Sequence, residues 1–227
     1  MNYRAIITDI EGTTSRISFV TDVLFPYAAK HLPDFIRQHQ AEPAVASELN
    51  EVRKLMQQAD ADTDSCISQL LQWIAEDKKV TPLKTLQGMV WANGYQSGAF
   101  TGHIYADVAA KLADWHRDGI QLYVYSSGSV AAQQLLFQHS DFGDLTPLFS
   151  GYFDTRIGAK RDVSAYAAIL QQLQLPPRQV LFLSDVTAEL DAACQLGIAT
   201  VQLTREDQSA GKHKTAKDFY QVQELMQ

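Results

Sequence analysis

The sequence predicts an α/β protein whose core is a doubly wound, Rossmann-like parallel sheet, with an inserted helical cap domain. Residues 1–16 and 100–227 alternate short apolar runs with helical repeats, whereas residues 17–99 show helical periodicity alone. Parallel strands are covered on both faces and therefore appear as continuous apolar runs, with helices crossing between them. We expect residues 1–16 and 100–227 to form the core and residues 17–99 to form the cap.

The first apolar run, at residues 5–7, predicts the strand around which the rest of the chain is organised. Its sequence is Ala-Ile-Ile without polar alternation, and Asp9, Glu11 and Gly12 follow at its end. Gly12 allows the backbone to turn sharply directly after the acidic residues. Asp9 is therefore expected at the carboxyl end of a strand, which is where open α/β sheets bind their ligands. The alternative is a turn with two solvated acids.

The later part of the chain repeats the alternation of strands and helices. Apolar residues at helical spacing precede Gly119, and the run at 120–125 then predicts a second strand. The same criteria predict helices at 130–137, 163–173, 186–196 and 219–226, and strands at 180–183 and 199–203, with a polar loop after residue 203.

The predicted cap consists of helical segments only. Apolar residues recur at helical spacing over 19–36, 42–60, 64–79 and from Pro82 onward. Pro33 is expected to interrupt the first of these helices, because proline lacks the amide that a helix interior needs. The Asn-Gly-Tyr-Gln-Ser-Gly sequence at 93–98 is typical of a loop and is expected to close the cap.

Size and composition exclude several classes of protein. The 227 residues are 46% apolar, which argues against a disordered chain, and the formal charge of −7 argues against a nucleic-acid groove or an anionic membrane surface. Neither a signal peptide nor an apolar run long enough to span a bilayer is evident, so we expect a soluble, cytoplasmic monomer. Cys66 and Cys194 are expected to be reduced core thiols rather than a disulfide.

Three of the predicted strands end in side chains suited to phosphate chemistry. These ends carry Asp9, the pair Ser126 and Ser127, and Asp185, and parallel strand ends can converge on one crevice. Two carboxylates suit Mg²⁺, which favours one or two protein carboxylates together with substrate phosphate. Each residue alone could equally be a helix cap or a turn residue.

Two further residues complete the predicted site. Lys160 precedes a helix and could act as a point charge on phosphate, although a solvated lysine is the alternative. Glu11, two residues beyond Asp9, is suited to act as a general acid and base. Asp9 is then the candidate nucleophile.

Taken together, these segments resemble the four motifs of the haloacid dehalogenase-like hydrolase superfamily. The segments are Asp-Ile-Glu-Gly-Thr-Thr at 9–14, Ser-Ser-Gly-Ser at 126–129, Lys160, and Ser184 with Asp185. Most phosphatases of that superfamily carry aspartate where this chain has Glu11. With Trp91, the 93–98 segment and His103, this variant resembles the enolase-phosphatases of methionine salvage.

The resemblance implies a Mg²⁺-dependent enzyme, with one ion per chain, that acts on a small phosphorylated diketone, 2,3-diketo-5-methylthiopentyl 1-phosphate. It implies enolisation followed by dephosphorylation through an aspartyl-phosphate on Asp9, with Glu11 as the acid and base. Asp9, residue 11 and Asp185 would hold the metal, and Ser126, Ser127 and Lys160 would bind phosphate. The alternatives are another phosphatase of the superfamily, a dehalogenase and a non-catalytic binding module. A dehalogenase would have no use for a metal, so Glu11 and Asp185 count against it.

Overall fold

The computed structural model describes residues 3–206 and 208–226 and divides them into two compact units. The first unit takes in the residues up to Ile17 together with those from Thr101 onward, and the second is Ser18–Phe100. Both boundaries fall one residue later than the expected changes after residues 16 and 99. No helix among the described residues combines the length and apolar character needed to cross a membrane.

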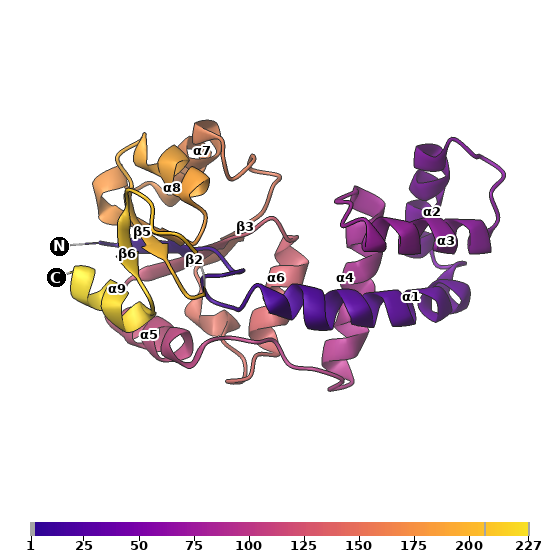
Figure 1. Cartoon of the computed structure of the whole chain (residues 1–227), viewed down its shortest axis with the longest axis horizontal. Coiled ribbons are helices and arrows are strands. Elements are labelled where there is room, and N and C mark those ends of the chain that lie inside the picture. The colour runs from indigo at the N-terminus through magenta and orange to yellow at the C-terminus, as the bar shows by residue number, and fades with distance from the viewer. Residues whose placement is uncertain (1–2, 207, 227) are drawn as a thin grey trace. The chain divides into compact units, whose positions relative to one another are not determined.

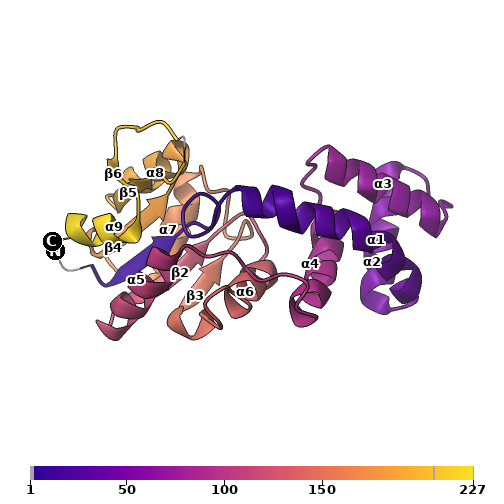
Figure 2. The same cartoon turned by 60° about the horizontal axis from the view of Figure 1, so that its bottom comes forward.

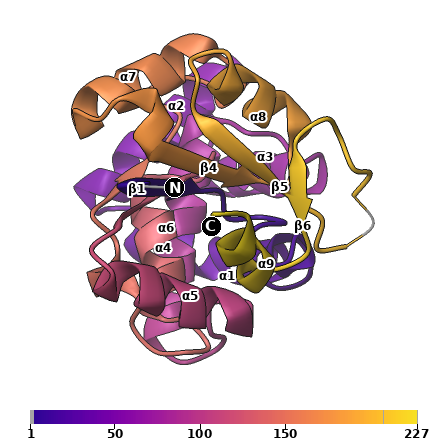
Figure 3. The ribbon, with the colours of Figure 1, turned by 90° about the vertical axis from the view of Figure 1, so that its left-hand side faces the viewer.

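The first unit is built on a parallel sheet in the order β3-β2-β1-β4-β5-β6. Figure 1 labels β2, β3, β5 and β6, and Figure 3 labels β1 and β4. Every neighbouring pair is parallel, which confirms the predicted doubly wound α/β class. The three-residue strands β3 and β6 were not predicted, because so short a segment carries no measurable periodicity. The strands are β1 (Ala5–Thr8), β2 (Gln121–Tyr125), β3 (Gly151–Phe153), β4 (Val180–Ser184), β5 (Ala199–Leu203) and β6 (Lys214–Ala216).

Helices cover both faces of this sheet. Figure 3 shows α7 and α8 on one face and α5 and α9 on the other. Alternate residues of β1 serve the two faces: Ala5 and Ile7 pack in the cluster that contains Tyr166 of α7 and Leu190 of α8. The helices of this unit are α5 (Ala106–Arg117), α6 (Val130–Gln138), α7 (Val163–Leu173), α8 (Thr187–Cys194) and α9 (Phe219–Leu225), with 3₁₀ turns at Thr146–Leu148 and Pro177–Gln179.

The strand order fixes where a ligand can bind. From β1 the chain adds β2 and β3 on one side and then β4, β5 and β6 on the other, so the order reverses between β1 and β4. Crevices in doubly wound sheets open at such a switch point, beyond the carboxyl ends of the strands. The residues that follow β1 and β4 are therefore the first candidates for a functional site.

The second unit consists of helices joined by turns and short loops, as predicted. Its elements are a π-helical turn (Val20–Leu24), α1 (Phe25–His39), α2 (Pro43–Met56), α3 (Thr63–Ala75) and α4 (Thr81–Gln96). Helix α1 packs against α3 and α4 (Figures 1 and 2). The expected interruption at Pro33 is wrong, because α1 continues through it. Leu32 and Ile36 on either side are fully buried, and their packing outweighs the lost helix hydrogen bond.

The predicted loop at residues 93–98 is also wrong in its first part, since α4 extends to Gln96. Gly94 meets a packing requirement there. A Cβ at this position would lie 2.5 Å from the ring of Phe100 and 2.8 Å from the ring of Tyr27, closer than atoms can approach. The glycine thus permits close ring packing against the helix.

The two cysteines differ in environment. Cys66 is buried in the helical unit, as expected, and both thiols are free. Cys194 is exposed, so its prediction as a core residue is wrong. It is the last residue of α8 and lies off the helix face that carries Leu190 and Ala193, both of which are fully buried.

Candidate active site

The carboxylate of Asp9 lies directly beyond β1 and is almost fully buried, with 3% of the residue exposed. The Asp9 amide donates to the Leu183 carbonyl over 2.9 Å, which continues the β1–β4 pairing by one residue. The Ile10 amide donates to Asp9 Oδ1 over 2.7 Å. Backbone contacts thus fix both the main chain and the side chain of the residue predicted to be the nucleophile.

The loop after Asp9 folds back sharply on itself. The Ile10 carbonyl accepts hydrogen bonds from the amides of Thr13, Thr14 and Ser15, and Gly12 adopts a φ of +70°. A Cβ at Gly12 would collide with the carboxylate of Asp185. The glycine therefore allows the loop backbone to approach the acid that follows β4, which brings together two segments far apart in the sequence.

Lys160 is paired with two acids in the buried site. Its Nζ lies 2.6 Å from Asp9 Oδ1 and 2.7 Å from Glu189 Oε2, and 9% of its side chain is exposed. Burial alone would lower the pKa of Lys160, but the charges and hydrogen bonds of the two acids outweigh burial and raise it. The ammonium is therefore kept charged beside Asp9, and the alternative of a solvated lysine is wrong.

Glu189 was not identified from the sequence. Its carboxylate is buried, and Ser184 Oγ lies 3.0 Å from its Oε2 and 3.3 Å from Asp9 Oδ2, while the Val186 amide donates to Ser184 Oγ. The sequence does contain a signal for Glu189. This residue lies four positions after Asp185 and next to the apolar face of α8, where a buried charge needs a partner.

The carboxylates of Asp9 and Asp185 form an electrostatically unfavourable pair. Burial, followed by the negative charge of Asp9, raises the pKa of Asp185 to about 6. A cation would relieve that repulsion, and two oxygen donors are enough for Mg²⁺, which retains waters and binds substrate phosphate. Among residues 3–206 and 208–226, no three His, Cys, Asp or Glu side chains converge as a metal-binding group. The donor set therefore fits Mg²⁺ and lacks the nitrogen and sulfur ligands typical of Zn²⁺.

The turn after β2 brings Ser126 to the same edge of the sheet. Ser126 is buried, its Oγ accepts a hydrogen bond from the Gly128 amide, and it lies 3.5 Å from Glu11 Oε2. Ser127 is exposed at the same turn, and Glu11 is half-buried. Gln133 of α6 donates to the Gly128 carbonyl over 2.8 Å and so braces the turn.

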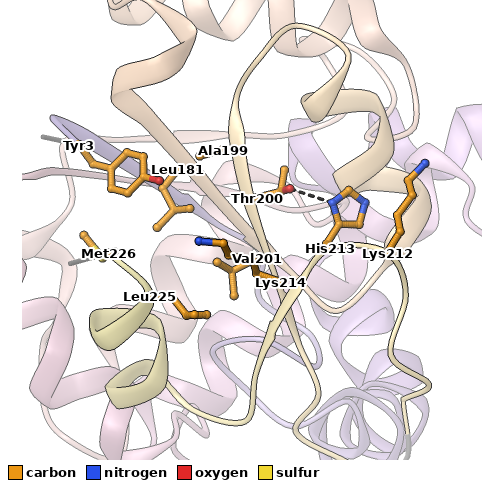
Figure 4. A pocket seen from close by; sticks show the side chains of 10 residues that line it. All are labelled: Tyr3, Leu181, Ala199, Thr200, Val201, Lys212, His213, Lys214, Leu225 and Met226. Atoms are coloured by element: carbon orange, nitrogen blue, oxygen red, sulfur yellow. Dashed lines mark hydrogen bonds between the residues drawn. The ribbon is translucent and has the colours of Figure 1, made fainter. Parts of the chain in front are cut away.

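A separate cavity lies at the opposite edge of the sheet, at the amino ends of β4, β5 and β6. The cavity has a volume of about 370 Å³. Figure 4 shows the side chains that line it. His213 lies in its wall, where its ring nitrogens are 2.8 Å from Thr200 Oγ1 and 2.8 Å from Asp191 Oδ1. Since Asp9 and Asp185 follow the carboxyl ends of β1 and β4, this cavity is not part of the site described above.

A buried aspartate follows the first strand, a lysine is paired with it, and a second aspartate follows β4. On a doubly wound sheet, this combination is suited to attack by a carboxylate on phosphorus. The chain belongs to the haloacid dehalogenase-like hydrolases, whose family model matches residues 3–197.

Individual proteins of this family match the sequence over most of its length. It is 56% identical to the enolase-phosphatase E1 of Pseudomonas aeruginosa strain UCBPP-PA14, covering 98% of this chain and 99% of that protein. It is 59% identical to the enolase-phosphatase E1 of Hahella chejuensis, over 89% of this chain and 87% of that one. The crystal structure of the UTR4 protein of Saccharomyces cerevisiae matches with a TM-score of 0.81 at 35% identity, covering 96% of this chain and 99% of that chain.

Proposed function

We propose that this protein is an enolase-phosphatase that converts 2,3-diketo-5-methylthiopentyl 1-phosphate to 1,2-dihydroxy-5-methylthiopent-1-en-3-one, the acireductone of methionine salvage. The observation that carries the proposal is the buried Asp9 held against Lys160 at the end of the central strand. Identity of 56% to an enolase-phosphatase E1 over 98% of the chain supports the choice within the hydrolase family.

In the phosphatase step, an Asp9 carboxylate oxygen attacks phosphorus in line, and the bond from phosphorus to the enol oxygen breaks. The ammonium of Lys160 and the hydroxyls of Ser126 and Ser127 bind the non-bridging phosphate oxygens in this mechanism. Water then attacks the aspartyl-phosphate, which releases inorganic phosphate and regenerates Asp9.

Glu11 is proposed to transfer protons both when the aspartyl-phosphate forms and when water hydrolyses it. It donates a proton to the leaving enol oxygen and then, as the carboxylate, takes a proton from the attacking water. Glu11 Oε2 lies 3.5 Å from Ser126 Oγ, so this acid is next to a residue that is proposed to bind phosphate. For the preceding enolisation, Glu11 is also the candidate base that removes the proton from the carbon next to a carbonyl.

Mg²⁺ is the proposed cofactor, held by the carboxylates of Asp9 and Asp185 and by the backbone carbonyl of residue 11. The carbonyl is proposed rather than the Glu11 side chain because the proposed mechanism uses that side chain for proton transfer. When bound, Mg²⁺ would neutralise charge on the phosphate oxygens.

The test supplies the diketo phosphate with Mg²⁺ and follows the ultraviolet absorbance of the enol product together with phosphate release. We expect both signals, with enol formation preceding phosphate release. Phosphate release without enol formation would favour another phosphatase of the family. Chloride release from a 2-haloacid, with neither signal, would favour a dehalogenase, and a protein inactive in all three assays would favour a binding module.

A further inference from the structure

Arg205, two residues beyond β5, is buried and makes contacts with three separate segments. Its Nε donates to the Thr13 carbonyl over 3.0 Å, and its terminal nitrogens form a two-pronged ion pair with Asp107 over 2.9 and 2.8 Å. Only 4% of its side chain is exposed. The guanidinium lies 4.3 Å from the ring centre of Tyr105 and 5.3 Å from that of Phe219. Every part of this side chain is therefore held in one orientation.

The anchor of Arg205 is itself rigid. Asp107 lies in the first turn of α5, and its Oδ2 also accepts a hydrogen bond from the Phe219 amide at the start of α9. The Asp107 carboxylate thus joins the beginnings of two helices that pack against each other. A two-pronged arginine–carboxylate pair also fixes direction, which a lysine cannot do.

The segment that Arg205 holds is the loop that carries Glu11 and Gly12. This loop is not fully stabilised by its own contacts, because the hydroxyl of Thr13 is buried and finds no hydrogen-bond partner among residues 3–206 and 208–226. Gly12 has a positive φ. From outside the loop, Arg205 binds the Thr13 carbonyl, and the Tyr105 amide donates to the Thr14 carbonyl over 3.0 Å.

We propose that Arg205 is a positioning residue for the proposed reaction: it fixes the Thr13 peptide, and through it the placement of Glu11 and the residue-11 carbonyl. The role of Arg205 is geometric rather than electrostatic, because the charge of Asp107 cancels the charge of Arg205 at short range. Loss of the Nε contact allows the loop to relax away from the geometry needed for proton transfer, and such displacements reduce turnover strongly.

The test compares variants that keep the charge with variants that keep neither charge nor shape. Arg205→Lys retains the positive charge but cannot bind Asp107 and the Thr13 carbonyl together, so kcat is expected to fall at least tenfold while KM changes less than about threefold. The double variant Arg205→Gln with Asp107→Asn removes the ion pair without leaving a lone buried charge, and the same loss of kcat is expected.

Chemical rescue distinguishes positioning from simple stabilisation. In Arg205→Ala, ethylguanidinium at concentrations far below denaturing ones should restore kcat, whereas ethylammonium should not. Ile169→Ala of α7 is the matched control, because Ile169 is fully buried in the cluster with Phe182 and Leu190, and that cluster is separate from Tyr105, Asp107 and Phe219. It should lower the melting temperature to a similar extent without lowering kcat, when all variants are assayed well below their melting temperatures.

Because this role depends on the proposed function, the wild-type protein is assayed in parallel. A wild type inactive on the diketo phosphate contradicts the proposed function. An active wild type with unchanged kcat in both the Arg205→Lys and the double variant overturns the positioning role. Equal rescue by ethylammonium and ethylguanidinium, or a loss of kcat in Ile169→Ala that matches its loss of thermal stability, also overturns it.

Discussion

At the residue scale, the proposed chemistry depends on a small set of buried charges that neutralise one another. The ammonium of Lys160 lies between the carboxylates of Asp9 and Glu189, and the Ser184 hydroxyl lies between the same two acids. Removing one partner of a buried ion pair costs about 3–5 kcal/mol when a charge is left alone, but isosteric amides retain much of the packing. Amide substitutions can therefore separate catalysis from folding.

Asp9→Asn should abolish phosphate release, by about 10³-fold or more, because an amide is not a nucleophile toward phosphorus. The fold should persist, since Lys160 keeps Glu189 as its partner and Asn retains an oxygen for the Ile10 amide. Phosphate release and the melting temperature are measured together. Exposed Asp118→Asn is the control and should remain fully active. Turnover by Asp9→Asn near the wild-type rate would remove Asp9 from the nucleophile role.

Glu189→Gln should lower kcat/KM by roughly 10- to 100-fold, the range expected when a hydrogen bond to a charged group is lost. Without Glu189, the Lys160 ammonium binds Asp9 alone and is less available to phosphate. Glu189→Asp should show a loss too, because its shorter side chain cannot span the gap to Lys160. Steady-state kinetics at several concentrations of the diketo phosphate provide the check. A wild-type kcat/KM in both variants would contradict this role.

At the element scale, glycines and one histidine determine how closely neighbouring segments pack. Helix α4 contains two glycines with opposite surroundings: a Cβ at Gly94 would lie 2.5 Å from the Phe100 ring, whereas a Cβ at Gly88 would meet nothing within 4 Å. In the first unit, the imidazole of His103 binds the segment that follows the loop of Asp9, at Ser15 and Arg16. Each feature gives a prediction that concerns stability rather than chemistry.

Gly94→Ala and Gly88→Ala form a matched pair in one helix. Gly94→Ala should lower the stability of the helical unit by about 1–3 kcal/mol through overpacking. Gly88→Ala should raise it by about 0.5–1 kcal/mol, because alanine loses less backbone entropy in a helix. Thermal and urea unfolding give both values. A shift of the two variants in the same direction would show that the packing at Gly94 does not decide its identity.

His103 should make stability depend on pH. The Arg16 amide donates to its Nδ1 over 3.2 Å, which requires a free lone pair on that nitrogen. Burial, followed by the charge of Arg16, lowers the pKa of His103. The unfolded chain, with an ordinary histidine pKa near ~6.5, therefore binds the proton first. The free energy of unfolding should fall as pH drops through that value toward the lowered pKa.

His103→Asn should reduce this slope without removing the contributions of the other histidines. The measurement is urea unfolding of wild type and variant between about pH 5 and 7.5, with the two slopes subtracted. Identical slopes would mean that His103 titrates alike in the folded and unfolded chains.

At the scale of the whole molecule, the proposed cofactor couples segments from opposite halves of the sequence. Asp9 follows β1 and Asp185 follows β4, and the helical unit, α5 and α7 all lie between them in the chain. Ion binding would therefore stabilise the contact between the loop at Gly12 and the end of β4.

Removal of Mg²⁺ by a chelator should abolish activity, and added Mg²⁺ should restore it. The ion should also raise the melting temperature, because a ligand at 100 times its Kd stabilises the folded state by about 2.7 kcal/mol. Asp185→Asn should reduce that rise, and Asp118→Asn should not. Full activity in chelator, together with no change in melting temperature, would refute the metal assignment.

The sequence by itself determined the elements whose signal is local. Residues 5–7 appeared as a buried strand because every side chain is apolar, and β1 is buried at each position. Asp9 and Asp185 could be located because the ends of parallel strands face the same edge of a sheet. The helical unit was recognisable because periodicity over many residues reports a buried face.

Only the tertiary structure decided the features that depend on a partner far along the chain. Gly94 appeared to mark a loop and is helical because Phe100 and Tyr27 fill the space beside it. The charge of Glu189 is balanced by Lys160, 29 residues earlier, and Arg205 reaches Thr13 across 192 positions. Residue order and periodicity report whether a side chain is buried, but they carry no information about which distant group it meets. That information arises only when the sheet brings its strand ends together.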